Sequence, residues 1–127
     1  MAELGAPATR KGTSRATTPD PDFDWREIVW LMQVSRALDR LEETRLVPER
    51  KVLYQFSARG HDMAQIMLGT RLDHPRDGAC GYYRSRPFLL ALGVELEDAL
   101  GSAMCRAGGY SDGRDIGVVI NYLNPAG

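Results

Sequence analysis

Cysteine and long apolar runs are scarce in this chain of 127 residues, and each shortage excludes a class of protein. The two cysteines, Cys80 and Cys105, form no Cys-x-x-Cys pair, so a disulfide framework is not expected. Reduced thiols are typical of the cytoplasm, and we expect a cytoplasmic protein. No run approaches the ~18 apolar residues of a membrane helix, and the N-terminus lacks the apolar core of a secretory signal. The sequence therefore predicts no membrane partner.

An excess of charge of either sign is also missing. The 16 basic and 17 acidic residues leave a net charge of -1. Because nucleic-acid-binding proteins usually carry a strongly basic surface, we expect no nucleic-acid partner. The near balance of charge still permits a local basic site for a small anion.

Two regions differ in composition. Residues 1–22 are rich in alanine, threonine, proline and charge, and they cannot bury enough apolar surface to offset the entropy lost on ordering. We expect a flexible tail there. The length and the hydrophobic fraction of 43% predict one small domain over residues 23–127.

Hydrophobic spacing predicts a long first helix. It should begin at Asp24, a capping residue, and end near Val47, because Pro48 follows. Its apolar stripe recurs at steps of three and four: Leu31, Val34, Leu38 and Leu41. Glu42 and Glu43 are expected on the solvent-exposed face of this helix.

Shorter elements follow along the chain. Further helices are expected at 61–71, at 85–93 and at 95–105. The helix at 85–93, the third along the chain, opens with a serine cap and closes with a glycine. Short strands are expected at 79–82 and 116–120. The mixture favours an α/β fold class in which helices dominate.

A tyrosine and two arginines stand immediately before the third helix. Free amides and the helix dipole at such a place favour an anion. The guanidinium groups of Arg84 and Arg86 can donate paired hydrogen bonds to phosphate oxygens, and the Tyr83 hydroxyl can add a donor. The alternative is an ordinary solvated turn with both arginines on the surface.

Two further motifs have weaker chemistry. His61-Asp62 could hold a metal in a phosphohydrolase, but the only other histidine is His74, so the start of a helix is the favoured interpretation. Gly113-Arg114 lies in a polar loop that could contact a ligand or a subunit, or be a surface turn. No arrangement typical of nucleophilic catalysis occurs, and no catalytic residue is assigned.

Four motifs in order carry a family resemblance: Arg40-Leu41-Glu42-Glu43, Gly60-His61-Asp62, Tyr82-Tyr83-Arg84 and Gly113-Arg114. Over about residues 25–124 the chain resembles the alpha-type N-terminal region of the decarboxylating component of thiamine-diphosphate-dependent 2-oxo acid dehydrogenases. It is most similar to the branched-chain type and its alpha–beta fusions. The resemblance implies an incomplete, helix-rich part of a thiamine-diphosphate-binding fold.

The resemblance also implies roles for individual residues. Tyr83 and Arg84 would contact the diphosphate of the cofactor, and His61, Arg86 and Arg114 would border the active site. The family places a glutamate where Asp62 stands. It often has a histidine soon after the Gly-Arg pair, where this chain has Val118-Val119-Ile120, which puts lipoyl contacts there in doubt.

The family binds Mg²⁺ through a Gly-Asp-Gly motif and a later asparagine, and neither occurs before Gly127. The metal ligands are therefore expected beyond the end of a truncated chain. Implied partners are a beta-type half, separate or fused, a lipoyl-bearing acyltransferase and further subunits of an oligomer. Alone, the chain is expected to be inactive. Two alternatives stay open: a non-catalytic anion-binding or assembly module, and a metal-dependent phosphohydrolase.

Overall fold

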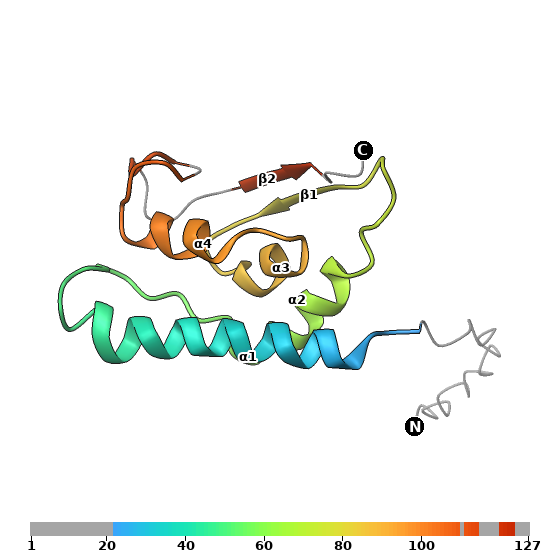
Figure 1. Cartoon of the computed structure of the whole chain (residues 1–127), viewed down its shortest axis with the longest axis horizontal. Coiled ribbons are helices and arrows are strands. Elements are labelled where there is room, and N and C mark those ends of the chain that lie inside the picture. The colour runs from blue at the N-terminus through green and yellow to red at the C-terminus, as the bar shows by residue number, and fades with distance from the viewer. Residues whose placement is uncertain (1–21, 110, 115–119, 124–127) are drawn as a thin grey trace, which may run out of the picture.

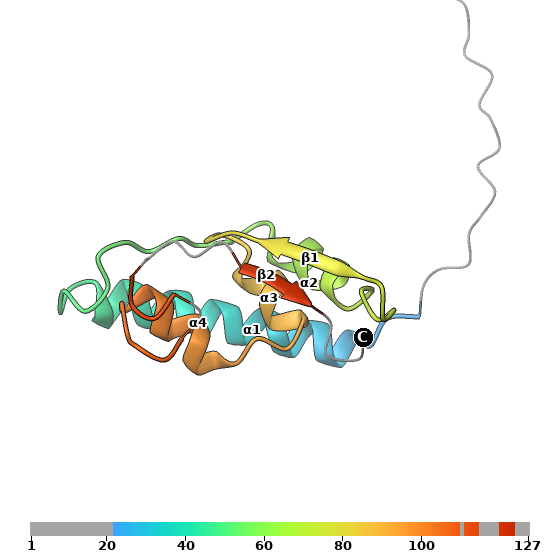
Figure 2. The same ribbon diagram turned by 90° about the horizontal axis from the view of Figure 1, so that it is seen from above.

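The computed structural model describes residues 22–109, 111–114 and 120–123. In these residues the elements follow one another as α1 (Trp25–Leu41), a π-helical turn η1 (Glu42–Leu46), α2 (Asp62–Gly69), β1 (Gly78–Gly81), α3 (Arg86–Ala91), α4 (Leu96–Ala103) and β2 (Ile120–Leu123). α1 forms one side, α2 and α3 lie against it, and the two strands lie side by side on the opposite side (Figures 1 and 2). The domain is mixed, and helices dominate it, as the sequence predicts.

α1 begins where the sequence predicts. The Asp24 carboxylate accepts hydrogen bonds from the backbone N–H groups of Arg26 and Glu27, at 2.9 and 3.1 Å. These bonds satisfy two amides that have no partner within the helix. The predicted stripe faces the interior, where Leu38 is buried and Leu31, Val34 and Leu41 are partly buried.

The end of α1 differs from the prediction. Residues Glu42–Leu46 form a π-helical turn rather than a regular α-helix. Glu43 is exposed as predicted, but Glu42 is completely buried, at 0% exposure. The prediction of a solvent-exposed Glu42 was therefore wrong. The reason is that Arg86 of α3 packs against this side of α1 and pairs with the carboxylate.

α2 and α3 pack closely because a glycine stands between them. A Cβ atom added at Gly69 would lie 2.6 Å from the Ala91 Cβ and 3.0 Å from the carbonyl oxygen of Phe88. Ile66 of α2 is fully buried in this region. The core continues from α3 as a cluster of Phe88, Leu89 and Val94, with Leu72, Ala79 and Leu92 packed against it.

β1 and β2 pair in antiparallel register, from Gly78 opposite Leu123 to Gly81 opposite Ile120. The strand predicted at 79–82 is thus confirmed with a shift of its bounds. Most of the strand predicted at 116–120 lies outside the described residues, as do residues 1–21 of the predicted tail. The helix predicted at 85–93 is present, but the side chain of Ser85, which precedes it, makes no capping hydrogen bond.

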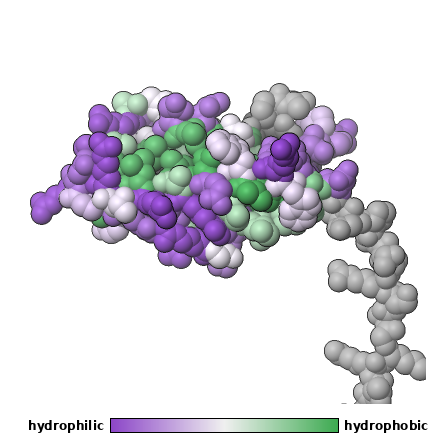
Figure 3. Space-filling model, turned by 60° about the horizontal axis from the view of Figure 1, so that its bottom comes forward, coloured by the Kyte–Doolittle hydropathy of each residue, from purple (hydrophilic) through white to green (hydrophobic). Residues whose placement is uncertain are grey.

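Burial is uneven over the helices. α4 contributes no buried residue, and Leu96 within it is 43% exposed. Trp30 of α1 is 68% exposed. On the face drawn in Figure 3, hydrophobic side chains form a continuous area bordered by hydrophilic ones. The core therefore lies mainly among α1, α2, α3 and β1, and the surface keeps an uncovered apolar area.

Candidate functional site

The turn between β1 and α3 holds the predicted anion-binding pair. The N–H of Ser85 donates to the carbonyl oxygen of Tyr82 at 2.7 Å and closes the turn. The Gln65 side chain of α2 donates from Nε2 to the carbonyl oxygen of Arg84 at 3.2 Å. Tyr83 and Arg84 therefore stand at the tip of a turn that is attached to α2.

Both side chains of the pair reach solvent. Tyr83 is 41% exposed, and Arg84 is exposed with its guanidinium carbon 5.7 Å from the centre of the Tyr83 ring. Among the described residues, no carboxylate forms a salt bridge with Arg84. A guanidinium and a phenol hydroxyl are both donors to phosphate oxygens. The pair can therefore offer hydrogen bonds to an anion.

Tyr83 of the pair belongs to an aromatic strip of four rings: Tyr54, Phe56, Tyr83 and Tyr82. Successive ring centres lie 6.1, 4.3 and 5.0 Å apart. The first and last distances are within the range of about 4.5–7 Å that ring pairs favour, and Phe56 and Tyr83 lie slightly closer than that. Sequence reasoning missed Tyr54 and Phe56, because their segment is too short to classify by periodicity.

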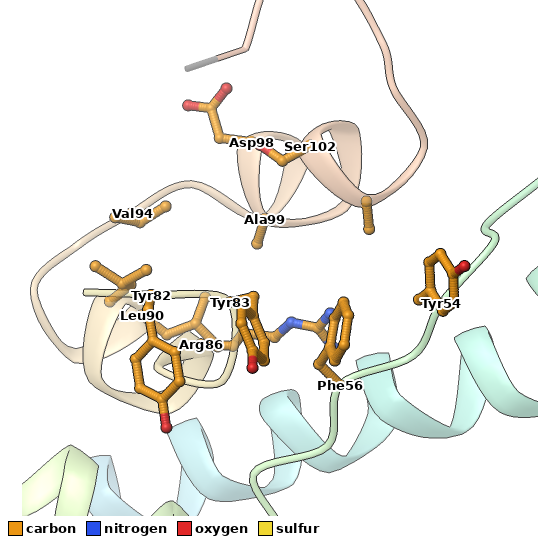
Figure 4. A pocket seen from close by; sticks show the side chains of 12 residues that line it. Tyr54, Phe56, Tyr82, Tyr83, Arg86, Leu90, Val94, Asp98, Ala99 and Ser102 are labelled. Atoms are coloured by element: carbon orange, nitrogen blue, oxygen red, sulfur yellow. The ribbon is translucent and has the colours of Figure 1, made fainter. Parts of the chain in front are cut away.

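A cavity of about 60 Å³ opens between the aromatic strip and α4. Its walls include Leu89 and Leu90 of α3 and Ala99 of α4, and Arg86 also reaches it (Figure 4). In the same view the Asp98 carboxylate points away from the aromatic rings. A space of this size holds a few water molecules but not a whole cofactor. These walls could therefore hold only one end of a larger ligand.

Arg86 does not behave as the neighbouring Arg84 does. Its side chain is 11% exposed, its Nη1 donates to Asp39 Oδ1 at 3.1 Å, and its Nη2 donates to Glu42 Oε1 at 2.5 Å. Arg86 also lines the cavity, and its role at the border of an active site stays a prediction. The surface turn considered as an alternative is wrong for Arg86. We call Asp39, Glu42 and Arg86 the carboxylate lock.

The two carboxylates of the lock differ in their other partners. Asp39 also accepts a hydrogen bond from Ser57 Oγ at 2.5 Å, and Arg59 Nε lies 3.9 Å from it. Glu42 Oε2 is buried and has no hydrogen-bond partner among the described residues. Burial therefore raises the pKa of Glu42, and the nearby Arg86 charge offsets this only in part.

The raised pKa of Glu42 predicts a loss of stability on deprotonation. Between its ordinary value of 4.5 and the higher pKa in the folded state, the folded protein binds more protons than the unfolded one. The free energy of unfolding should therefore fall as the pH rises through this window. In Glu42→Gln this fall should be absent, since the amide does not titrate. Urea unfolding at a series of pH values measures how the free energy of unfolding depends on pH in wild type and in Glu42→Gln. Equal slopes for the two proteins would contradict a raised pKa at Glu42.

His61 and Asp62 lie where the helix-start interpretation puts them. His61 is exposed and precedes α2, whose first residue is Asp62. Asp62 is buried and accepts a hydrogen bond from Arg36 Nε at 2.7 Å. Burial alone would raise the pKa of Asp62, but the bond and charge of Arg36 outweigh it and lower the pKa. The described residues contain no group of three or more His, Cys, Asp and Glu side chains that could hold a metal.

Arg114 is exposed in a turn, and its backbone N–H donates to the carbonyl oxygen of Ser111 at 3.1 Å. Gly113 has φ +73°, and a Cβ there would lie 2.6 Å from the carbonyl oxygen of Cys105. The turn therefore requires glycine for its own geometry. Of the predicted residues, Tyr83 and Arg86 line the cavity, whereas Arg84, His61 and Arg114 do not. Tyr83, Arg84 and Arg86 share one turn, and His61 and Arg114 lie elsewhere in the chain.

Comparison with models of protein families, with curated proteins and with solved structures found no match to this chain. Within the described part of the chain, no helix has the length and apolar character needed to cross a membrane. The site therefore has to be interpreted from its own geometry.

Proposed function

We propose that this chain is part of the decarboxylating component of a thiamine-diphosphate-dependent 2-oxo acid dehydrogenase, in which Tyr83 and Arg84 hold the diphosphate end of the cofactor. The observation that supports this most is the exposed Tyr83-Arg84 pair on a tethered turn, with Arg84 unpaired by any described carboxylate. The complete enzyme would act on a 2-oxo acid, of the branched-chain type by resemblance, and pass the acyl group to a lipoyl group. We keep the cytoplasmic location as a prediction.

The donor set fits the diphosphate but not the whole cofactor. A phenol and a guanidinium suit phosphate oxygens, whereas the cavity of about 60 Å³ is too small to enclose the rings. Thiamine diphosphate, when bound, supplies the carbanion chemistry of decarboxylation, and the protein supplies binding and orientation. In this proposal the Mg²⁺ ligands and the remaining walls of the site come from outside the described residues, including a beta-type half.

The test is a titration of the full chain with inorganic diphosphate, followed by chemical shifts in NMR spectra. Wild type is expected to bind with a dissociation constant on the order of 1 mM, with shifts centred on Tyr83 and Arg84. Arg84→Met should weaken binding about tenfold, because it removes a charged, bidentate donor. The matched control is Arg76→Met, since Arg76 is an exposed arginine in a different loop and should leave binding unchanged.

A second titration separates the proposed enzyme from a non-catalytic anion-binding module. If the aromatic strip and the cavity contact the cofactor beyond its diphosphate, thiamine diphosphate should bind several times more tightly than inorganic diphosphate. Equal affinities would favour the anion-binding module. If neither inorganic diphosphate nor thiamine diphosphate binds, the role given to Tyr83 and Arg84 is refuted.

A further inference from the structure

The charged residue closest to the anion pair along the turn is itself withdrawn from anion binding. Arg86 lies two positions after Arg84, yet its guanidinium forms salt bridges with two buried carboxylates, Asp39 of α1 and Glu42 of η1. Asp39 and Glu42 have side chains only 3% and 0% exposed, so neither can exchange Arg86 for water at low cost. The turn therefore carries one solvent-exposed arginine, Arg84, and one that is bonded within the protein, Arg86.

We propose that Arg86 is a positioning residue: held by Asp39 and Glu42, it fixes the Tyr82–Arg86 turn so that Tyr83 and Arg84 keep their exposed, anion-binding arrangement. This inference rests on the anion-binding role proposed above. It differs from a role at the active-site border, because the Arg86 guanidinium is bonded to Asp39 and Glu42 and acts on the diphosphate through the backbone of the turn.

The geometry of the lock supports a positional role. A guanidinium is a rigid planar fork, and here its two Nη atoms reach two different carboxylates about one helical turn apart, Asp39 of α1 and Glu42 of η1. Two such bonds fix the orientation as well as the distance of the group. Because Arg86 is the first residue of α3, they set where α3 begins relative to α1.

A second restraint acts on the same turn from α2. Gln65 Nε2 holds the carbonyl oxygen of Arg84, while Gln65 Oε1 is buried without a described hydrogen-bond partner. The turn is thus attached to α1 through Arg86 and to α2 through Gln65. With both attachments, the backbone around Tyr83 and Arg84 loses little further entropy when a ligand binds.

A double variant separates a positional role from a purely stabilising one. Arg86→Met/Glu42→Gln removes the arginine together with the carboxylate that has no other described hydrogen-bond partner, while Asp39 keeps its bond to Ser57. The midpoint of unfolding of this double variant should therefore lie closer to that of wild type than the midpoint of the single variant Arg86→Met does. Diphosphate affinity should nevertheless be lower than in wild type by about tenfold, which corresponds to about 1.4 kcal/mol.

The independent readout is hydrogen exchange at the Ser85 amide, which donates to Tyr82 in the turn. In the double variant this exchange should accelerate by about tenfold, reporting a looser turn. The matched control is Arg84→Met, which removes the ligand contact but not the lock. It should lose affinity while Ser85 exchange stays as in wild type.

Wild-type affinity and wild-type Ser85 exchange in the stable double variant would overturn the positional role. If wild type binds no diphosphate, the proposed function fails, but Ser85 exchange still decides whether the lock fixes the turn. If the double variant does not fold, Arg86→Lys replaces it, because it keeps the charge and loses only the planar fork. That variant should weaken binding and accelerate Ser85 exchange by about threefold each, and unchanged values would again overturn the inference.

Discussion

Replacing Arg86 by methionine is expected to lower the free energy of unfolding by about 3–5 kcal/mol, a large share of the stability of a small domain. The reason is the environment that the substitution leaves behind. Glu42 would lose the only described group that bonds its carboxylate, and Asp39 would lose one of its partners, in a place where water does not reach them. Urea unfolding followed by circular dichroism measures the effect.

Arg84→Met is the control for this experiment, because it makes the same change two positions earlier. Arg84 is exposed and forms no salt bridge with a described residue, so its loss should change stability by no more than about 0.5 kcal/mol. A loss below about 1 kcal/mol for Arg86→Met would show that Asp39 and Glu42 are not buried against Arg86. The two variants together therefore distinguish an arginine that supports the fold from one that is available to a ligand.

Local signals in the sequence were sufficient for the helices. The start of α1 follows from Asp24, whose short carboxylate accepts hydrogen bonds from the amides of the first turn. The spacing of the leucines gives its inner face in part, since Leu38 is buried but Ser35 and Asp39 are buried as well. The positions of α2, α3 and α4 follow in the same way, with bounds that shift by one or two residues. These features depend on neighbours within a few positions, which is the range over which periodicity and capping act.

The carboxylate lock could not be predicted in this way. Glu42 pairs with a residue 44 positions later, and Gln65 holds a carbonyl 19 positions later. On α1 alone, Glu42 beside Glu43 has the pattern of a solvent-exposed charged pair. Only the packing of α3 against α1 shows which of the two glutamates is inside.

The candidate site was predicted in part. Tyr83 and Arg84 were predicted because an arginine just before a helix start can bind an anion and because the family resemblance places a cofactor contact there. Tyr54 and Phe56, which extend the aromatic strip, come from a distant segment without regular secondary structure, and their contact with Tyr83 is tertiary. The role of Tyr83 and Arg84 in holding a diphosphate remains a prediction that the titrations test.

Gly69→Ala is expected to destabilise the protein even though alanine favours helices more than glycine does. The added methyl group would lie 2.6 Å from the Ala91 Cβ and 3.0 Å from the Phe88 carbonyl oxygen, so α2 and α3 would have to move apart. Neither obstacle is the end of a flexible side chain that could turn away. Overpacking of this kind typically costs about 1–3 kcal/mol, and we expect a net loss in that range by urea unfolding.

The matched control is Gly101→Ala, the same substitution in α4. A Cβ there would meet only the Arg106 Cβ, at 4.0 Å, which is ordinary contact. Since no clash opposes the better helix propensity of alanine, this variant should be more stable than wild type by up to about 1 kcal/mol. Opposite signs for the two variants would confirm that α2 and α3 meet at Gly69. If Gly69→Ala stabilises the protein as Gly101→Ala does, the close packing that places α3, and with it Arg86 and the anion-binding turn, is wrong.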